Sequence, residues 1–334
     1  MAIYEKISVI GGGAWGTALA AMSSRAGRDV LLWAREKDVV TSINEAHENK
    51  DFLPGISLPP TLKATGSLAA TADADLILMV VPAQFVRSVA QEMKSHLKES
   101  TPIVLCAKGI EQSSGKLMNE VMVEVLPKSP LVVLSGPTFA REVATDMPSA
   151  VTIASKYQQI AQNVADTLGQ ATFRPYLSRD VVGAEVGGAV KNVLAVACGI
   201  VAGMELGENA RAALITRGLA EMVRFGEALG AKAETMIGLC GLGDLILTCS
   251  SPQSRNMSLG MALGQGKTVD EIMSGRISVA EGYHTAGILA EIAARENIEM
   301  PIAGAVNEIL HNGGNVKEIV QELMNRPYVS EQEG

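Results

Sequence analysis

Hydrophobic residues in the first half of the chain fall in short runs, separated by turns and by segments with helical spacing. The runs predict strands at residues 7–10, 29–35, 75–82, 102–107, 131–134, 150–154 and 172–176, with helices at 15–26, 84–97 and 158–168. The run at 75–82 is almost continuously apolar, as is typical of a strand that is buried on both faces. This alternation predicts an α/β fold with a parallel, doubly wound sheet, which binds its ligands at the carboxyl ends of the strands.

The pattern changes near residue 180, where strand-like runs stop and long helical stretches begin. Residues 181–204 are rich in Gly and Ala, which predicts a buried helix that packs closely against its neighbours. The later helices are expected at 209–229, 257–263, 269–274, 285–296, 303–310 and 316–324. The second half is therefore expected to be all helical.

The first predicted strand ends in a glycine-rich turn that leads directly into a helix. The spacing Gly11-x-Gly13-x-x-Gly16 is that of the dinucleotide-binding fingerprint in its required strand–turn–helix setting. Gly11 allows the tight turn, Gly13 lets the backbone approach a pyrophosphate, and Gly16 lets the helix pack close to the strand. The alternative is an ordinary glycine-rich turn. We expect a Rossmann-like dinucleotide-binding domain over residues 1–180 and an all-helical substrate domain over 181–334.

The end of the second predicted strand bears on the choice of cofactor. An NAD enzyme usually places an acid there for the ribose 2′-hydroxyl, but this strand ends in Trp33-Ala34-Arg35. An Arg fork suits a 2′-phosphate, so NADP is favoured over NAD. The alternative is that Arg35 caps the end of the sheet and Glu36 binds the ribose.

Composition excludes several classes of protein. The chain has 334 residues, 47% hydrophobic and 19% charged, with a net charge of −8 and no Lys/Arg run, so it is expected to be globular and not to bind nucleic acid. Its four cysteines lie in apolar stretches without metal-ligand spacing, which predicts reduced thiols, a cytoplasmic protein and no metal site. The N-terminal apolar run is too short for a signal peptide, and the run at 193–204 is too short to span a bilayer, so no stable membrane insertion is expected.

Two lysines are candidates for acid–base chemistry, because none of the four histidines lies in a catalytic-looking setting. Lys191 lies in a small-residue apolar helix, where a lysine is costly unless it has a partner or a function. Lys108 directly follows a predicted buried strand. The alternative for Lys191 is an edge position with its stem lying on apolar surface.

Two later stretches contain further polar candidates. Asp244 is a single acid among glycines and apolar residues, and it either pairs with a buried lysine or caps the helix that follows. Ser254-Arg255-Asn256 combines a hydroxyl, a guanidinium and an amide, which suits a phosphate at a helix start. The alternative for this triplet is a plain polar loop.

These residues belong to a pattern that resembles the bacterial NAD(P)-dependent glycerol-3-phosphate dehydrogenases essentially from end to end. The matching blocks are the opening Gly-Gly-Gly-Ala-Trp-Gly-Thr-Ala and the stretches at residues 107–109, 135–140, 188–193, 209–218, 241–245, 254–256 and 279–282. Several long blocks in order are far more specific than the glycine spacing alone.

The resemblance implies the reduction of dihydroxyacetone phosphate to sn-glycerol 3-phosphate, which supplies glycerophospholipid synthesis, with Lys191 as the proton donor and acceptor. It assigns substrate contacts to Lys108, Gly136, Thr138, Lys191, Asp244, Ser254, Arg255 and Asn256. It assigns the cofactor site to Gly11, Gly13, Ala14, Trp15, Gly16, Arg35, Lys108, Ala140, Arg255, Val279 and Glu281. Relatives often carry Ser where this chain has Ala14, and we expect only a small loss of hydrogen bonding there. We further expect a homodimer.

Two other functions remain open at this point. A related two-domain dehydrogenase that acts on a 3-hydroxy acid or a sugar acid would keep the fingerprint and the helix lysine, but it need not keep Ser254-Arg255-Asn256. A non-catalytic nucleotide sensor would need neither lysine.

Overall fold

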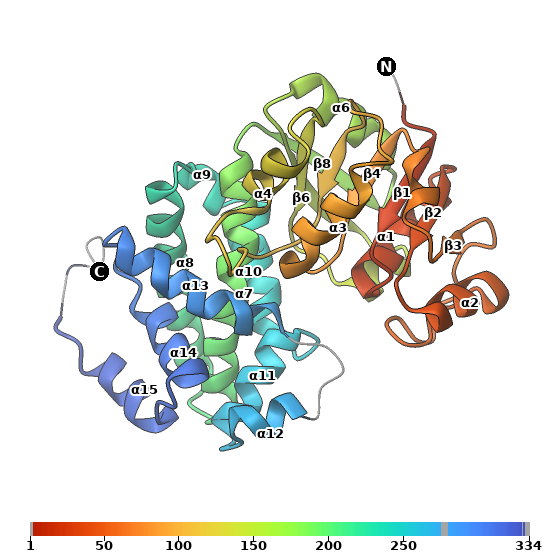
Figure 1. Ribbon diagram of the computed structural model, residues 1–334. Coiled ribbons are helices and arrows are strands. Elements are labelled where there is room, and N and C mark those ends of the chain that lie inside the picture. Colours follow the sequence, from red (N-terminus) through yellow and green to blue (C-terminus); the bar gives the residue numbers. More distant parts are fainter. Residues whose placement is uncertain (1–2, 275–279, 329, 331–334) are drawn as a thin grey trace. The chain divides into compact units, whose positions relative to one another are not determined.

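The computed structural model describes residues 3–274, 280–328 and 330 (Figure 1). The chain divides into two compact units. The first contains Met1–Lys108 and Lys116–Ala184, and the second contains Gly109–Gly115 and Glu185–Gly334. The short segment Gly109–Gly115, expected in the first domain, packs in the second unit, where Gln112 Nε2 donates to the carbonyl oxygen of His284 at 3.3 Å.

The first unit is built on an eight-stranded sheet with the order β3-β2-β1-β4-β5-β6-β7-β8. The strands are β1 (Lys6–Ile10), β2 (Asp29–Trp33), β3 (Lys63–Thr65), β4 (Leu76–Met79), β5 (Ile103–Leu105), β6 (Leu131–Ser135), β7 (Ser149–Ala154) and β8 (Phe173–Ser178). The main helices are α1 (Ala14–Arg25), α2 (Lys37–Ala46), α3 (Val86–Met93), α4 (Met118–Val125), α5 (Ala140–Ala144) and α6 (Gln158–Leu168), with short 3-10 helices at Ala69–Ala72 and Ala83–Phe85.

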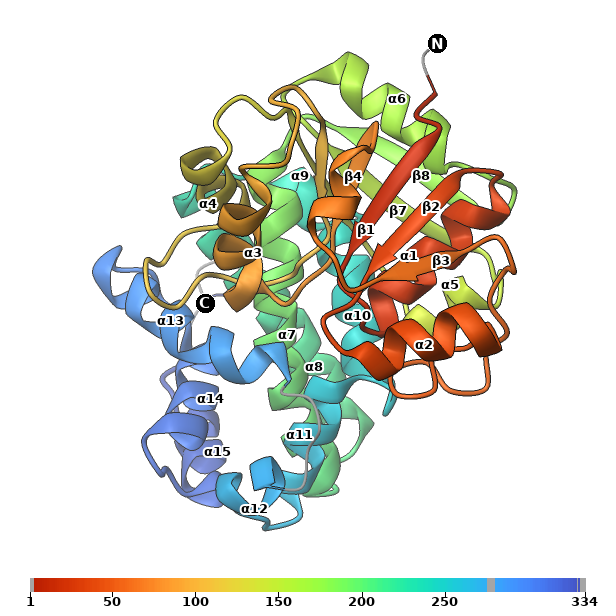
Figure 2. The ribbon, with the colours of Figure 1, turned by 45° about the vertical axis from the view of Figure 1, so that its right-hand side comes forward.

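Alternate residues of the strands face opposite layers of helices, because side chains alternate along a strand. Ile7 and Val9 of β1 belong to one core cluster together with residues of α1, α5 and α6. Ile10 and Ser8 are also buried but point to the other face, where α3 and α4 pack against each other (Figure 2). Helices therefore cover both faces, as the doubly wound prediction requires.

The expectation of an all-parallel sheet is wrong at one step. β6 and β7 are antiparallel, with Val133 opposite Ala154, whereas every other strand pair is parallel. The link between them contains only the five-residue α5, and a short connection returns the chain in the opposite direction. The hydrophobic pattern could not reveal this, because a buried strand has the same sequence pattern in either direction.

The second unit is organised around the long helix α7 (Val181–Gly203), which begins at the end of the first unit. The other helices are α8 (Glu208–Ala228), α9 (Ala233–Met236), the π-helical turn η3 (Leu239–Gly243), α10 (Asp244–Ser250), α11 (Arg255–Gly264), α12 (Val269–Ser274), α13 (Glu281–Arg295), α14 (Pro301–His311) and α15 (Val316–Met324). From Glu185 to Cys198 every residue of α7 is buried. The predicted close packing of this Gly/Ala-rich stretch is therefore confirmed.

Glycines bring the backbones of α7 and α11 into direct contact. A Cβ on Gly199 or Gly203 would lie 2.1 or 2.3 Å from a carbonyl oxygen of α11. In return, a Cβ on Gly260 or Gly264 would lie 2.0 or 2.5 Å from a carbonyl oxygen of α7. No side chain fits at these four positions, so the spacing of the two helices depends on them.

Two helical stretches in the described residues are long and apolar enough to span a membrane by length and composition alone. They are Val181–Gly203, with a mean hydropathy of 1.7, and Ala233–Ser250, with 1.2. The apolar helix Val181–Gly203 is therefore longer than the apolar run at 193–204 that was judged too short to span a bilayer. Within the first stretch, 89% of the most apolar window is buried inside the protein, so a core position accounts for its composition.

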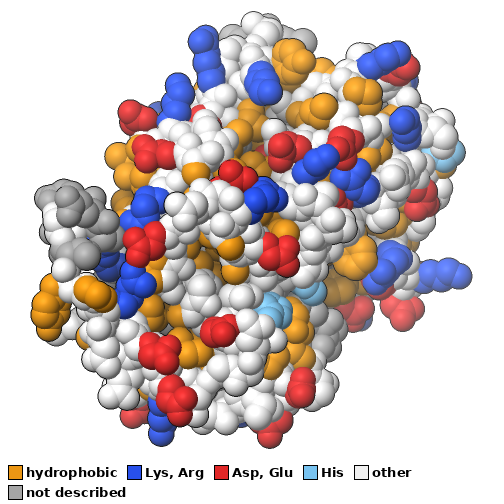
Figure 3. Space-filling view, turned by 60° about the vertical axis from the view of Figure 1, so that its left-hand side comes forward, with side chains coloured by type: hydrophobic (Ala, Val, Ile, Leu, Met, Phe, Trp, Pro, Cys, Tyr) orange, Lys and Arg blue, Asp and Glu red, His pale blue; other side chains and the backbone are white. Residues whose placement is uncertain are grey.

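Surface charges of both signs are mixed. On the face drawn in Figure 3, Lys and Arg side chains are interspersed with Asp and Glu side chains. Several of the surface charges form exposed ion pairs, such as Lys6 with Asp73 at 2.7 Å and Lys128 with Glu99 at 2.7 Å. Such pairs contribute little to stability, because solvent screens them.

A buried carboxylate joins α8 to the start of α14. The two oxygens of Glu221, a residue that is 1% exposed, accept hydrogen bonds from the backbone N–H groups of Ile302 at 2.7 Å and Ala303 at 3.1 Å. Burial raises the pKa of Glu221 to about 7, although the two N–H donors and Arg224 act in the opposite direction. The unfolded chain therefore releases this proton at a lower pH than the folded chain does.

This difference predicts a pH-dependent contribution to stability. Glu221 stabilises the fold most below its unfolded pKa, and its contribution is lost as the pH rises from about 4.5 to about 7. The free energy of unfolding should fall by up to about 3 kcal/mol over that range. Urea unfolding should show the wild type losing up to about 3 kcal/mol of stability relative to Glu221→Gln between about pH 4.5 and 7, because the amide does not titrate. Glu227→Gln, an exposed position on the same helix, is the control, and parallel pH profiles for wild type and Glu221→Gln would contradict the prediction.

Candidate functional site

The fingerprint loop lies where the order of the strands reverses. β1 pairs with β2 on one side and with β4 on the other, and Gly11 follows β1 directly. Gly11 has φ +128°, and a Cβ there would lie 2.9 Å from the backbone carbon of Val80. A Cβ on Gly16 would lie 1.9 Å from the carbonyl oxygen of Gly11, so only glycine lets α1 pack this close to the turn. In doubly wound sheets, this switch point is where ligands bind.

The middle fingerprint glycine, Gly13, has open space where Gly11 and Gly16 have close contacts. A Cβ on Gly13 would have no heavy atom within 4 Å, and Gly13 is exposed. It is the N-cap of α1, no side chain caps this helix end, and its first turn holds no acidic residue. The first N–H groups of the helix, at Ala14 and Trp15, therefore start a region of positive potential suited to a phosphate. The loop fits the pyrophosphate of a dinucleotide.

The end of β2 is exposed. Arg35 donates from Nε and an Nη atom to Glu36 Oε1, at 3.1 and 2.9 Å, and its side chain is 75% exposed. The guanidinium therefore lies at the surface next to Glu36, the alternative residue for binding the ribose.

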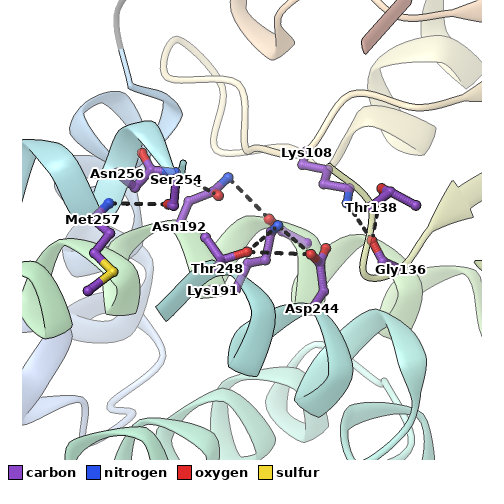
Figure 4. A network of polar contacts seen from close by, with 11 residues as sticks. Lys108, Gly136, Thr138, Lys191, Asn192, Asp244, Thr248, Ser254, Asn256 and Met257 are labelled. Atoms are coloured by element: carbon purple, nitrogen blue, oxygen red, sulfur yellow. Dashed lines mark hydrogen bonds and ion pairs between the residues drawn. The ribbon is translucent and has the colours of Figure 1, made fainter. Parts of the chain in front are cut away.

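Lys108 and the turn after β6 form a second polar group in the first unit. Lys108 Nζ donates to the carbonyl oxygen of Gly136 at 2.9 Å, and the Thr138 hydroxyl donates to the same oxygen at 3.2 Å (Figure 4). Gly136 has φ +145°, and a Cβ there would lie 3.1 Å from Val151 Cα. The structure thus brings together the three candidates that follow β5 and β6.

In the second unit, Lys191 is buried and ion-paired. Its Nζ donates to Asp244 Oδ1 at 2.6 Å and to the Thr248 hydroxyl at 2.9 Å (Figure 4). Lys191 is 7% exposed and Asp244 is 1% exposed. A buried ammonium next to a buried carboxylate is stable only as a pair, because removing either partner leaves an uncompensated charge. The edge position for Lys191 and the helix-cap role for Asp244 are both excluded by this geometry.

The π-helical turn η3 sets the position of Asp244. Gly243 N–H bonds to the carbonyl oxygen of Gly238 at 3.0 Å, which is a bond across five residues. A Cβ on Gly241 would lie 1.9 Å from the carbonyl oxygen of Met236, and one on Gly187 would lie 2.3 Å from that of Cys240. Glycines therefore let the turn press against α7, which places Asp244 beside Lys191. π-helical turns often occur at functional sites.

The start of α11 holds the triplet. Ser254 is the N-cap of this ten-residue helix, and its hydroxyl accepts from Met257 N–H at 3.2 Å. Asn256 Nδ2 donates to Asn192 Oδ1 at 2.8 Å, and Asn256 Oδ1 accepts from Gly282 N–H at 2.9 Å. The triplet is therefore no plain loop, because Asn256 links it to α7 and α13.

The remaining candidates lie at helix starts or outside the described residues. Ala14, Ala140 and Glu281 are the first residues of α1, α5 and α13, and Trp15 follows Ala14 in α1. Val279 lies outside the residues that the structure describes. Among the described residues, no group of three or more His, Cys, Asp or Glu side chains could hold a metal ion.

Models of one protein family match both halves of the chain. The N-terminal model of the NAD-dependent glycerol-3-phosphate dehydrogenases matches residues 6–161, and their C-terminal model matches residues 180–321. The chain belongs to this family.

Individual glycerol-3-phosphate dehydrogenases match over nearly the whole length. The glycerol-3-phosphate dehydrogenase [NAD(P)+] of Parvibaculum lavamentivorans is 55% identical over 98% of each chain. That of Rhodospirillum rubrum is 57% identical over 97% of this chain and 93% of its own. The crystal structure of the Coxiella burnetii glycerol-3-phosphate dehydrogenase, 41% identical, superposes with a TM-score of 0.93 and covers 96% of this chain and 99% of that one.

One member of the Lys191 network, Thr248, is not among the candidates predicted from the sequence. Thr248 lies four residues after Asp244, one turn on in α10, and its hydroxyl meets both Lys191 Nζ and, at 3.5 Å, Asp244 Oδ1. A threonine in an apolar helix gives no sequence signal of such a role. Its spacing of four residues from Asp244 is a usable sequence signal if Asp244 pairs with Lys191.

The contrast between two fingerprint glycines gives a direct test. Gly13→Ala should leave the free energy of unfolding nearly unchanged, since the new methyl enters open space at φ −71°, but should weaken NADPH binding. Gly16→Ala should lower stability by about 1–3 kcal/mol, because its methyl meets the carbonyl oxygen of Gly11. Thermal unfolding and fluorescence titration with NADPH measure the two effects. Equal losses of stability in the two variants would contradict the assignment of Gly13 to open space.

Proposed function

We propose that this chain reduces dihydroxyacetone phosphate to sn-glycerol 3-phosphate, reversibly, with a nicotinamide cofactor. The observation that carries the proposal is the buried Lys191–Asp244–Thr248 network, in a chain that matches the glycerol-3-phosphate dehydrogenase models in both of its parts. Relatives that are 55–57% identical carry the name glycerol-3-phosphate dehydrogenase [NAD(P)+].

Lys191 is the group that handles the proton in this proposal. When bound, the reduced nicotinamide supplies a hydride to the carbonyl carbon of the substrate. The carbonyl oxygen gains negative charge, which the Lys191 ammonium stabilises and then neutralises with a proton. Asp244 and Thr248 hold the ammonium in place through the bonds at 2.6 and 2.9 Å, so the donor needs no reorganisation when the charge develops.

The start of α11 is assigned to the phosphate of the substrate. Arg255 offers a guanidinium fork for two phosphate oxygens, and Ser254 and Asn256 flank it. Asn256 is held by Asn192 and Gly282, so it is fixed before substrate binds. Lys108, Gly136 and Thr138 are assigned to the substrate as well, with Lys108 adding positive charge.

The residues present fit a dinucleotide. The open space at Gly13 and the uncapped start of α1 suit a pyrophosphate, and Gly11 and Gly16 allow the turn. Ala14, Trp15, Arg35, Lys108, Ala140, Arg255, Val279 and Glu281 are assigned to the rest of the cofactor. Exposed Arg35 favours NADPH, because its fork can leave Glu36 for a 2′-phosphate.

The cellular setting is part of the proposal. The four cysteines are buried thiols that form no disulfide, which suits a reducing compartment and supports a cytoplasmic location. The product supplies glycerophospholipid synthesis. We assign the active form as a homodimer.

A single assay tests the reaction. Dihydroxyacetone phosphate should cause loss of NADPH absorbance, and NADH should serve less well. 3-Hydroxy acids and sugar acids, tested with the oxidised cofactor, should give no turnover. Turnover of a 3-hydroxy acid alone would favour the related-dehydrogenase alternative, and NADPH binding without turnover of any of these would favour a sensor.

Lys191→Ala tests the proton donor. We expect turnover to fall at least about a thousandfold, since both charge stabilisation and proton transfer are lost, while NADPH binding is nearly intact. The variant also leaves Asp244 buried without its partner, at a cost of about 3–5 kcal/mol. The double variant Lys191→Met/Asp244→Asn, which removes both charges, controls for stability. Appreciable turnover by either variant at saturating substrate would contradict the assigned role.

A further inference from the structure

Asn49, a buried residue between α2 and β3, contacts the fingerprint loop directly. It is 0% exposed. Its Nδ2 donates to the carbonyl oxygen of Gly12 at 2.8 Å and to the hydroxyl of Thr17 at 2.8 Å. Its Oδ1 accepts from Phe52 N–H at 3.1 Å, which fixes the orientation of the amide. Asn49 thus uses both of its N–H donors on the turn and first helix of the fingerprint.

The bond to Gly12 controls the direction of the next N–H group. In a planar trans peptide, the carbonyl of one residue and the N–H of the next point in opposite directions. Asn49 draws the Gly12 carbonyl toward the buried side of the loop, so the N–H of Gly13 points the other way. Gly13 is exposed and has open space where a Cβ would stand. The orientation of this N–H is therefore set by a buried side chain on the opposite side of the backbone.

Few other contacts could hold this peptide. A Cβ on Gly12 would lie 2.4 Å from Ala34 Cβ, so no side chain at this position could brace the loop. The Thr17 hydroxyl reaches the Gly12 carbonyl only at 3.4 Å, whereas Asn49 reaches it at 2.8 Å. The hydrogen bond from Asn49 to the Gly12 carbonyl is the shorter of the two. Asn49 also orients Thr17 by donating to its hydroxyl.

We propose that Asn49 is a positioning residue for cofactor binding, which presets the Gly13 peptide toward the pyrophosphate of the dinucleotide. It acts through Gly12 and does not touch the cofactor. The inference rests on the proposed function, because it takes the fingerprint loop as the cofactor site. It goes beyond that function by assigning a role to a residue outside the fingerprint.

Asn49→Asp is the decisive variant. It keeps the size of the side chain and the acceptor for Phe52, but a carboxylate cannot donate to the Gly12 carbonyl. We expect the Kd and the KM for NADPH to rise about tenfold or more, as for the loss of a buried hydrogen bond. The kcat at saturating NADPH should change by less than about threefold, because the Lys191 network is untouched.

Asn44→Asp is the control for a new carboxylate in the first unit, at an exposed position. Asn44 lies on α2 in the same unit and also clamps backbone, donating to the carbonyl oxygen of Ala64 at 3.0 Å and accepting from its N–H at 2.8 Å. It loses the same amide and gains the same charge, but it does not contact the fingerprint loop. Its Kd for NADPH should stay within about twofold of the wild type. An equal rise in both variants would overturn the proposal.

A second variant keeps the test decisive if Asn49→Asp does not fold. Asn49→Ala removes both donors to Gly12 and Thr17 without adding a charge, so a rise of a few-fold or more in the NADPH Kd supports the proposal and an unchanged Kd overturns it. Fluorescence titration of the wild type separates the two levels of inference. If the wild type binds NADPH and Asn49→Asp binds it equally well, only the role of Asn49 fails. If the wild type binds no NADPH, the proposed function fails and the role of Asn49 with it.

Discussion

Contact between main chains without intervening side chains is the constraint on which the second unit depends. Gly187, Gly199 and Gly203 remove the side chains that would otherwise separate α7 from η3 and α11. Their absence lets the helix sink into the core and carry Lys191 with it. The ammonium is then surrounded by apolar residues, so Asp244 and Thr248 are needed as partners. The buried position of Lys191, and with it the chemistry assigned to this residue, therefore depends on the glycines of its own helix.

The first unit uses the same device for a different purpose. Gly16 lets α1 approach the turn after β1, and Gly11 accepts a positive φ beside Val80. The close approach leaves the helix start exposed at the point where the strand order reverses. In both units glycine removes bulk so that a charged or polar group is held at a defined place. In the first unit this group is a set of backbone N–H donors, and in the second it is a side-chain ammonium.

Much of the fold could be predicted from the sequence, because local patterns decide it. The spacing of α6, α12 and α15 predicts those helices to the residue, and the apolar run at 75–82 predicts β4 but extends three residues beyond its end at Met79. α2 and α4 are not predicted, since α2 buries only Val39 and Ile43 and α4 is only eight residues long. The reversal at β7 was missed because strand direction leaves no trace in side-chain alternation.

The candidate site divides in the same way. Lys191 could be singled out because a lysine in an apolar helix is costly. Pairing with Asp244 was only one of two roles open to that acid, since Asp244 is 53 residues away and has an equally good local role as a cap. The residues assigned to substrate and cofactor came mainly from the resemblance. Asn49 and Thr248 are ordinary polar residues in sequence, and only their contacts in three dimensions give them a role.

The helix pair α7–α11 also has a consequence for how the sequence can change over time. The atoms that would meet a new Cβ on Gly199, Gly203, Gly260 or Gly264 are mainly backbone atoms, which every residue type carries. A substitution elsewhere cannot shrink a backbone, so no second-site change can compensate. These positions should therefore stay fixed as lineages diverge, and they should not co-vary. Neighbouring side-chain contacts, such as that of Leu194 with Gly218, can be exchanged in pairs.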